Sequence, residues 1–379
     1  MSIYTQVCQM SKEARNVFRG EYPSFVFGSN SREIDFIPIF VYHRIDPVEF
    51  ESDLNFLQTN GYRTVTGEEY IRWLSGERGL WKRCVFLTFD DGMSSVYLHG
   101  LPLLKKYSMH AMVFLVAGYI PEQVENDEPN GRDNLWNPLL SWDEIRHMQT
   151  SGCFSFGSHT CYHHPVFISD KIIDFVKPES DAMLFDIPVE KTTEMEILQK
   201  GETKLWGAPI YRHNHFMKSK CLYGNKRAAN ACMEHVQEKG GAPFFKRASW
   251  GRELKEVAAR YRSWGRMMGS REVSELIAAD LKASKAVIEQ RLGSEILQLC
   301  YPAGAGSALS VMLSKEAGYR INLWQTLPGN NKNQPGCDPF RLVRLKKDFL
   351  RRLPGRGRRS LSDIYWHKVK RRIKGNPYY

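Results

Sequence analysis

The sequence lacks the features of a membrane-spanning, secreted or disulfide-stabilised protein. Its 379 residues contain no run of about 18 uncharged apolar residues, so we expect no transmembrane helix. The N-terminal residues lack the short apolar core of a secretory signal. The 8 cysteines are scattered without a CxxC pair, which argues against a disulfide framework or a zinc ribbon. We therefore expect a globular, cytoplasmic protein with reduced thiols.

Acidic residues are almost absent from the C-terminal end. Residues 351–379 hold ten lysines or arginines against one aspartate, a net charge of +9, whereas the whole chain carries +11. The body is thus nearly neutral, which argues against a nucleic-acid enzyme, because such enzymes carry their charge around the site. Apolar and aromatic residues lie among the cations of the tail. We predict a basic tail that either lies on an anionic membrane surface or forms a solvated, disordered end.

From Ile37 onward the sequence alternates between apolar strands and amphipathic helices. Ser141 and Glu144 form a capping box that begins one of these helices. The alternation predicts parallel βα units, hence an α/β barrel or a doubly wound sheet. Apolar runs predict strands at 37–42, 84–89, 111–116 and 296–301, and apolar spacing predicts helices at 50–60, 101–107 and 273–292.

The alternation is interrupted between about residues 168 and 269. This stretch begins with a charged, proline-containing segment and continues with sequence patterns that predict helices at 226–239 and 253–262. We interpret it as an insertion, and we expect its HxH pair, His213 and His215, to lie in an exposed loop. The predicted organisation is an N-terminal extension (1–36), a catalytic domain (37–350) that contains the insertion, and a basic tail (351–379).

Polar residues follow two of the predicted strands. Asp90 and Asp91 come directly after strand 84–89, where two carboxylates are costly unless a cation neutralises them. His159 and His163 follow a further strand end predicted at 154–157, and an i, i+4 spacing places two imidazoles on one helical face, where they can share a metal. One aspartate and two histidines leave open positions on a divalent ion, as in catalytic sites. The alternative is a solvated acidic turn and a structural histidine pair.

Together these motifs resemble the polysaccharide deacetylases of carbohydrate esterase family 4, which share the NodB-like homology domain. TFDDG at 88–92 is followed by HTCYH at 159–163. YHRI at 42–45 precedes both, as in the rearranged branch that includes the poly-N-acetylglucosamine deacetylases. The resemblance implies a distorted (β/α) barrel with a large, mostly helical insertion. It also implies a metal-dependent hydrolase that removes an acetyl group from an N-acetylated sugar or polysaccharide.

The resemblance assigns a role to each catalytic and metal-binding position. Asp90 would be the general base and His43 the general acid. Asp91, His159 and His163 would hold one divalent ion. Zinc is the expected ion, and cobalt, nickel or manganese would fit the same ligands.

Further positions are implied for the oxyanion and the substrate. The backbone N–H of Ala303 would hold the oxyanion, and Tyr301 would offer a ring to a sugar. The third motif of the family is incomplete, because Cys300 stands where arginine is common. Arg344 or Arg341 would then orient the base.

Three alternatives remain open at this stage. His164 would replace His163 if the ligand spacing differed by one residue. A second alternative is that the enzyme is a deformylase or deacylase of a lipid-linked sugar at the cytoplasmic membrane face. A third alternative is that the chain is a non-catalytic homologue that binds a glycan. In each case the expected partner is a carbohydrate rather than a nucleic acid, and the expected location is the cytoplasm, peripheral at the inner membrane if the tail binds lipid.

Overall fold

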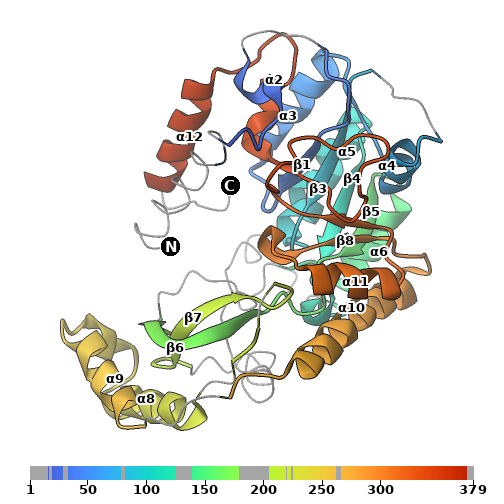
Figure 1. Cartoon of the computed structure of the whole chain (residues 1–379). Helices are drawn as coiled ribbons and strands as arrows, with labels where there is room; N and C mark the ends of the chain where they lie inside the picture. Colours follow the sequence, from blue (N-terminus) through green and yellow to red (C-terminus); the bar gives the residue numbers. More distant parts are fainter. Residues whose placement is uncertain are drawn as a thin grey trace. The chain divides into compact units, whose positions relative to one another are not determined.

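The computed structural model divides the chain into two compact units (Figure 1). The inserted unit comprises residues 162–279 and 306–310, and the sheet unit comprises 2–161, 280–305 and 311–379. No helix within the described residues has the length and apolarity needed to cross a membrane. The structure describes residues 16, 19–28, 33–77, 82–123, 139–178, 205–218, 220–222, 225–261 and 266–373.

The sheet unit is built around a parallel β-sheet. All pairings among its strands are parallel, and β3 and β4 are buried along their whole length. Burial on both faces explains why these strands are continuous apolar runs in the sequence. The strand order is β10 (Leu345–Lys346), β1 (Ile39–Tyr42), β3 (Cys84–Phe89), β4 (Ala111–Leu115), β5 (Phe154–Ser158), β8 (Gln298–Cys300) and β9 (Ile321–Leu323), with β2 (Arg63–Thr64) paired to β3.

The segment 339–346 closes this sheet into a barrel. Leu342 bridges Leu323 of β9 in parallel, and Leu345 pairs with Phe40 of β1. Because β9 and β10 are the two ends of the strand order, the segment that contains both Leu342 and β10 joins the edges. The structure confirms the predicted α/β barrel, which is distorted at this closure.

Helices follow the strands of the sheet unit. Asp46 caps α3 by accepting a hydrogen bond from Glu49 N at 2.9 Å, and the predicted Ser141–Glu144 capping box begins α6. The helices of the strand connections are α3 (Pro47–Thr59), α4 (Gly67–Leu74), η1 (Val96–Gly100), α5 (Leu101–Tyr107), η2 (Ala117–Tyr119), α6 (Trp142–Thr150), α10 (Ser270–Leu292), η5 (Pro302–Gly304) and α11 (Ala308–Glu316).

The inserted unit contains a β-hairpin and a small helical core. Strands β6 (Pro165–Phe175) and β7 (Pro209–His215) pair in antiparallel fashion. The hairpin was not predicted, and the HxH pair lies on β7 rather than in a loop, because two well-separated segments form the strand pair. Phe244 and Leu254 are fully buried in the core that is formed with α8 (Lys226–Glu238), η4 (Ala242–Lys246) and α9 (Trp250–Ala259).

The C-terminal segment is part of the folded sheet unit. Helix η6 (Lys347–Arg352) is followed by α12 (Leu361–Ile373), in which Lys368 and Arg371 both pair with Asp348. Arg352 and Arg358 donate to the carbonyl oxygens of Val26, Phe25 and Gly28, and so anchor α2 (Ser24–Phe27). The expectation of a solvated, disordered end is therefore wrong for residues 351–373. Residues 374–379 lie outside the described part of the chain.

Candidate active site

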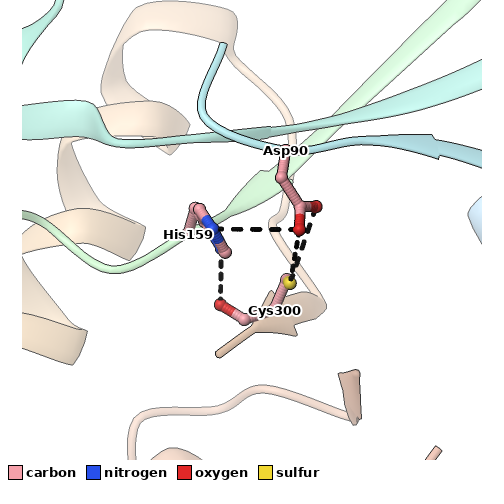
Figure 2. Close-up of side chains that lie close together, drawn as sticks. All are labelled: Asp90, His159 and Cys300. Carbon is pink, nitrogen blue, oxygen red and sulfur yellow. Dashed lines mark hydrogen bonds and ion pairs between the residues drawn. The ribbon is translucent and has the colours of Figure 1, made fainter. Parts of the chain in front are cut away.

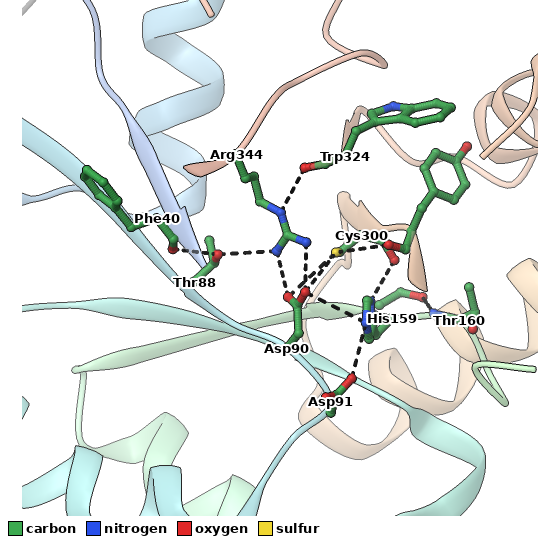
Figure 3. A network of polar contacts seen from close by, with 11 residues as sticks. Phe40, Thr88, Asp90, Asp91, His159, Thr160, Cys300, Trp324 and Arg344 are labelled. Carbon is green, nitrogen blue, oxygen red and sulfur yellow. Dashed lines mark hydrogen bonds and ion pairs between the residues drawn. The ribbon is translucent and has the colours of Figure 1, made fainter. Parts of the chain in front are cut away.

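The polar residues of the site lie where strands of the barrel end. His43 follows β1, Asp90 and Asp91 follow β3, and His159 follows β5. Because the carboxyl ends of parallel strands share one edge of the sheet, residues far apart in the sequence lie together there. Arg344 reaches the same place from the barrel-closing segment (Figure 3).

Asp90 is held by a buried arginine. Arg344 Nη1 and Nη2 donate to the two carboxylate oxygens at 2.7 and 2.8 Å. The guanidinium is itself fixed, since Nε donates to Trp324 O at 3.1 Å and Nη1 to Thr88 Oγ1 at 3.4 Å. Both partners are 2% exposed. Of the two arginines considered from the sequence, Arg344 binds Asp90, whereas Arg341 is exposed.

This pairing sets the charge of Asp90. Burial alone would raise the pKa of the carboxyl, but the positive charge of Arg344 and its hydrogen bonds hold that pKa well below its usual range. Burial alone would likewise lower the pKa of Arg344, and Asp90 keeps that pKa above its ordinary value. Asp90 is therefore an ionised, oriented carboxylate at neutral pH.

The thiol of Cys300 also contacts the carboxylate of Asp90. Its Sγ lies 3.7 Å from each carboxylate oxygen (Figure 2). Burial, reinforced by the nearby carboxylates, raises the pKa of the thiol well above its ordinary value. Cys300 is thus a neutral donor to Asp90, and the positive charge comes from Arg344 instead.

His159 presents one ring nitrogen to the two aspartates. Its Nδ1 lies 2.9 Å from Cys300 O, and since a carbonyl oxygen only accepts, Nδ1 carries the hydrogen. In the neutral ring Nε2 then bears a lone pair, which faces Asp91 Oδ1 at 3.4 Å and Asp90 Oδ2 at 3.9 Å. Lone pairs that face one another are stabilised by a cation between them. The donor set therefore suits a divalent metal ion.

A third candidate ligand, the imidazole of His163, joins Asp91 and His159. One ligand atom from each of Asp91, His159 and His163 lies within 4.8 Å of the other two, and all three residues are buried. His164, the alternative to His163, instead stacks its ring on Tyr162 with centroids 5.2 Å apart. His163 also contacts His215 of β7 edge to face, with centroids 5.6 Å apart. Sequence reasoning missed this neighbour, because the HxH spacing alone does not indicate what the strand faces.

The local backbone at the site is not helical. Thr160 and His163 have φ of 68° and 56°, so the expectation that His159 and His163 share a helical face is wrong. Asp91 and Ala303 have φ of 72° and 50°. Four of the six non-glycine residues with positive φ in the described chain thus lie in loops that carry site residues. Left-handed backbone in non-glycine residues is strained, and such strain is common at functional sites.

The remaining predicted residues differ in their outcome. His43 is half-buried and lies close enough to Asp90 for the two side chains to interact electrostatically. Ala303 is exposed on η5. Tyr301 is 0% exposed, its hydroxyl accepts a hydrogen bond from Asn322 at 2.8 Å, and its ring packs on Trp324. It therefore offers no ring face to a sugar, which corrects its assignment to substrate binding.

The sequence between residues 78 and 215 matches the family model for polysaccharide deacetylase. This chain carries a polysaccharide deacetylase domain. The matched segment contains Asp90, Asp91, His159 and His163, whereas His43 and Arg344 lie outside it.

Curated relatives of the polysaccharide deacetylase domain match over a limited length. YxkH from Bacillus subtilis (strain 168), a protein named after the same family, is 36% identical over 125 residues, or 31% of this chain and 45% of its own length. A poly-beta-1,6-N-acetyl-D-glucosamine N-deacetylase from Staphylococcus aureus (strain MRSA252) is 26% identical over 147 residues, or 38% of this chain and 44% of its own length. The chain thus spans less than half of each of these relatives.

Solved structures share the fold of this polysaccharide deacetylase domain. IcaB from Ammonifex degensii aligns with a TM-score of 0.50 at 18% identity, and the alignment covers 92% of this chain and 99% of that one. A de-N-acetylase from Aggregatibacter actinomycetemcomitans aligns with a TM-score of 0.50 at 17% identity over 82% of this chain and 94% of that one. At this level of identity the likeness establishes the fold alone.

Proposed function

We propose that the protein is a metal-dependent hydrolase that removes acetyl groups from an N-acetylated polysaccharide. The observation that carries this proposal is the buried Asp90–Arg344 pair beside Asp91 and His159. An ionised carboxylate next to a set of metal-ligating side chains is the arrangement that amide hydrolysis requires. The relative named as a poly-beta-1,6-N-acetyl-D-glucosamine N-deacetylase supports an N-acetylglucosamine polymer as the substrate class.

Asp91, His159 and His163 would hold the metal ion. When bound, the ion supplies Lewis-acid polarisation of the acyl carbonyl and lowers the pKa of a water molecule. Two imidazoles and one carboxylate favour zinc, and cobalt, nickel and manganese fit the same donors. The Nδ1 hydrogen bond from His159 to Cys300 O fixes the tautomer that directs Nε2 to the ion.

The residues of the chain would divide the proton transfers between them. Asp90 takes the proton of the water that attacks the acyl carbon, and Arg344 keeps its carboxylate aimed and ionised. The backbone N–H of Ala303 donates to the oxyanion that forms. His43 then protonates the nitrogen as the carbon–nitrogen bond breaks, so that the products are acetate and a free amine.

The alternatives considered from the sequence are less well supported. A glycan-binding homologue without activity has no need of a buried, charge-paired Asp90. A formyl or other acyl group on a lipid-linked sugar finds no support among the relatives described above. The cytoplasmic location and the attachment to an anionic membrane remain predictions, which fractionation of cells that produce the full-length protein would test.

Acetate release from N-acetylglucosamine oligomers tests the proposal. We expect release that a chelator abolishes and that a divalent ion restores. Asp90→Asn should lower the rate by about 10² or more, because a general base typically contributes about 10²–10⁴. Asp143→Asn is the matched control, since its carboxylate is 51% exposed on α6 and pairs with Arg146 at the surface. Equal rates in the two folded variants would refute the proposal.

A further inference from the structure

A second group of charged side chains lines a pocket in the sheet unit, between α3, η6 and α12. The pocket is partly open to solvent, and we call it the α12 pocket. None of the proposed catalytic or metal-binding residues lines it. Its cationic side chains are Lys347, Arg351, Arg359 and Arg371, and three carboxylates, Ile364 and His367 complete the lining.

Two of these cations are neutralised by carboxylates of the pocket. Arg371 pairs with Asp348, and its Nη1 lies 3.4 Å from Glu49 Oε2. Lys347 Nζ lies 3.3 Å from the same glutamate oxygen. Asp348 is also paired with Lys368. This half of the pocket is therefore a closed network of ion pairs.

The other two cations are paired less completely, since Arg351 has only a long ion pair with Asp53 within the described chain. The side chain of Arg359 makes no hydrogen bond or ion pair with any residue that the structure describes. Arg351 Nη1 donates to Ser52 O at 2.7 Å, whereas its Nε is buried without a hydrogen-bond partner within the described chain, and Asp53 Oδ1 lies 4.0 Å from Nε, beyond hydrogen-bond distance. Asp53 instead accepts from Tyr42 at 3.0 Å.

The two guanidinium groups also repel each other. Burial lowers the pKa of Arg351; the charge of Asp53 opposes this shift, and the positive charge of Arg359 adds to it. Like charges that share a partly enclosed pocket are unfavourable, and a buried N–H without an acceptor adds a further cost. Both costs are relieved by one anion that accepts hydrogen bonds from both arginines.

We propose that the α12 pocket binds a phosphate group through Arg351 and Arg359. A phosphate group fits because its oxygens accept bidentate hydrogen bonds from guanidinium forks, and one phosphate can serve two forks at once. The carboxylates of Glu49 and Asp348 are already paired and oppose it little. Asp53 is the carboxylate nearest to Arg351 Nε in this network, and burial raises its pKa to about 6, so it gains a proton readily beside an anion. The phosphate is either a soluble ester or a lipid headgroup, since Trp366 of α12 is 58% exposed beside His367.

Calorimetric titration of the full-length protein with inorganic phosphate tests this proposal. The titration is run at constant ionic strength in the presence of a chelator, so that phosphate on a metal ion does not contribute. We expect binding that Arg359→Gln weakens by about tenfold or more, because hydrogen bonds to charged groups are strong. Arg356→Gln is the matched control: it removes one charge from the same loop, is exposed and does not line the pocket.

The outcomes separate the proposal from general electrostatic attraction and from the proposed enzyme activity. No phosphate binding by the wild type, or equal weakening in the two variants, would overturn the site. Partial recovery in Arg359→Lys would support it even if Arg359→Gln folded poorly. Co-sedimentation with vesicles that contain phosphatidic acid, but not with phosphatidylcholine vesicles, would identify a headgroup as the source if Arg359→Gln abolished it. Binding of inorganic phosphate without vesicle binding would identify a soluble ligand.

Discussion

Replacing Arg344 by methionine should destabilise the protein and change the ionisation of Asp90. The guanidinium makes two charged hydrogen bonds to Asp90, at 2.7 and 2.8 Å, and both side chains are buried. Removing one partner of a buried ion pair costs roughly 3–5 kcal/mol, because the other charge is left without compensation. We expect a loss of this size in urea unfolding of Arg344→Met.

The same substitution should shift the pH dependence of acetate release. Arg344 is the largest of the influences that lower the pKa of Asp90 against its burial. Without it, burial raises this pKa, so the carboxylate is protonated at higher pH and the acidic limb of the rate profile moves upward. Arg344→Lys keeps the charge and should move the limb less.

Arg341→Met provides the control for both measurements. Arg341 lies on the same segment, is exposed, and has its guanidinium 5.9 Å from the centre of the Trp324 ring. Its loss should change stability by about 0.5 kcal/mol or less. The reasoning fails if Arg344→Met is as stable as Arg341→Met, or if the two variants share the pH profile of the wild type.

Three further substitutions probe other parts of the structure. Lys368 and Arg371 hold the pKa of Asp348 at about 2 although burial opposes this, so Asp348→Asn should cost about 2 kcal/mol above pH 4. Because a lowered pKa stabilises the fold only above the unfolded value, the gap to wild type should close as the pH falls toward 2; a gap that does not depend on pH in urea unfolding would contradict this. Phe244→Ala should destabilise the core of the inserted unit by roughly 3–5 kcal/mol and speed amide exchange in α8 and α9 more than Phe245→Ala does, and equal exchange would count against it. Gly304→Ala places a Cβ 2.5 Å from Gln325 N at a φ of 62°, so its melting temperature should fall further than that of Gly357→Ala, which has a positive φ and open space. A smaller fall in Gly304→Ala would show that the close approach is relieved.

Much of the barrel could be predicted from the sequence, because its signals are local. The buried strand Cys84–Phe89 and the helix Leu101–Tyr107 have the bounds that their apolar residues predict. The capping box at Ser141 is likewise a short-range pattern. Where hydrophobic periodicity and capping residues agree, the local sequence determines the type and the bounds of a helix or strand, and tertiary contacts change them little.

Features that depend on distant residues could not be predicted in this way. The partner of Asp90 lies 254 residues away, and the sequence left Arg341 and Arg344 open because the two are spaced three residues apart near a strand end. The spacing of His159 and His163 suggested a helix, but Thr160 and His163 adopt left-handed backbone instead. Tyr301 follows a strand in the way that a surface aromatic does, and only packing reveals that it is buried.

The basic tail is a further place where the structure differs from the expectation drawn from the sequence. Ten cations in 29 residues suggest a solvated or membrane-bound end. The structure uses Arg352 and Arg358 to bind carbonyl oxygens of α2, and Lys368 and Arg371 to bind Asp348. Composition reports how many charges a segment has, but it does not report whether the fold supplies acceptors for them.

The barrel closure by residues 339–346 has a consequence for biosynthesis. Asp90 is translated 254 residues before Arg344. Until then the carboxylate at the end of β3 has no cation to fix it, and β9 and β1 have no segment between them. The nascent chain therefore lacks a complete active site until Arg344 has been translated. A product cut before residue 344 would keep every residue of the family signature between 78 and 215 and still lack an ordered base.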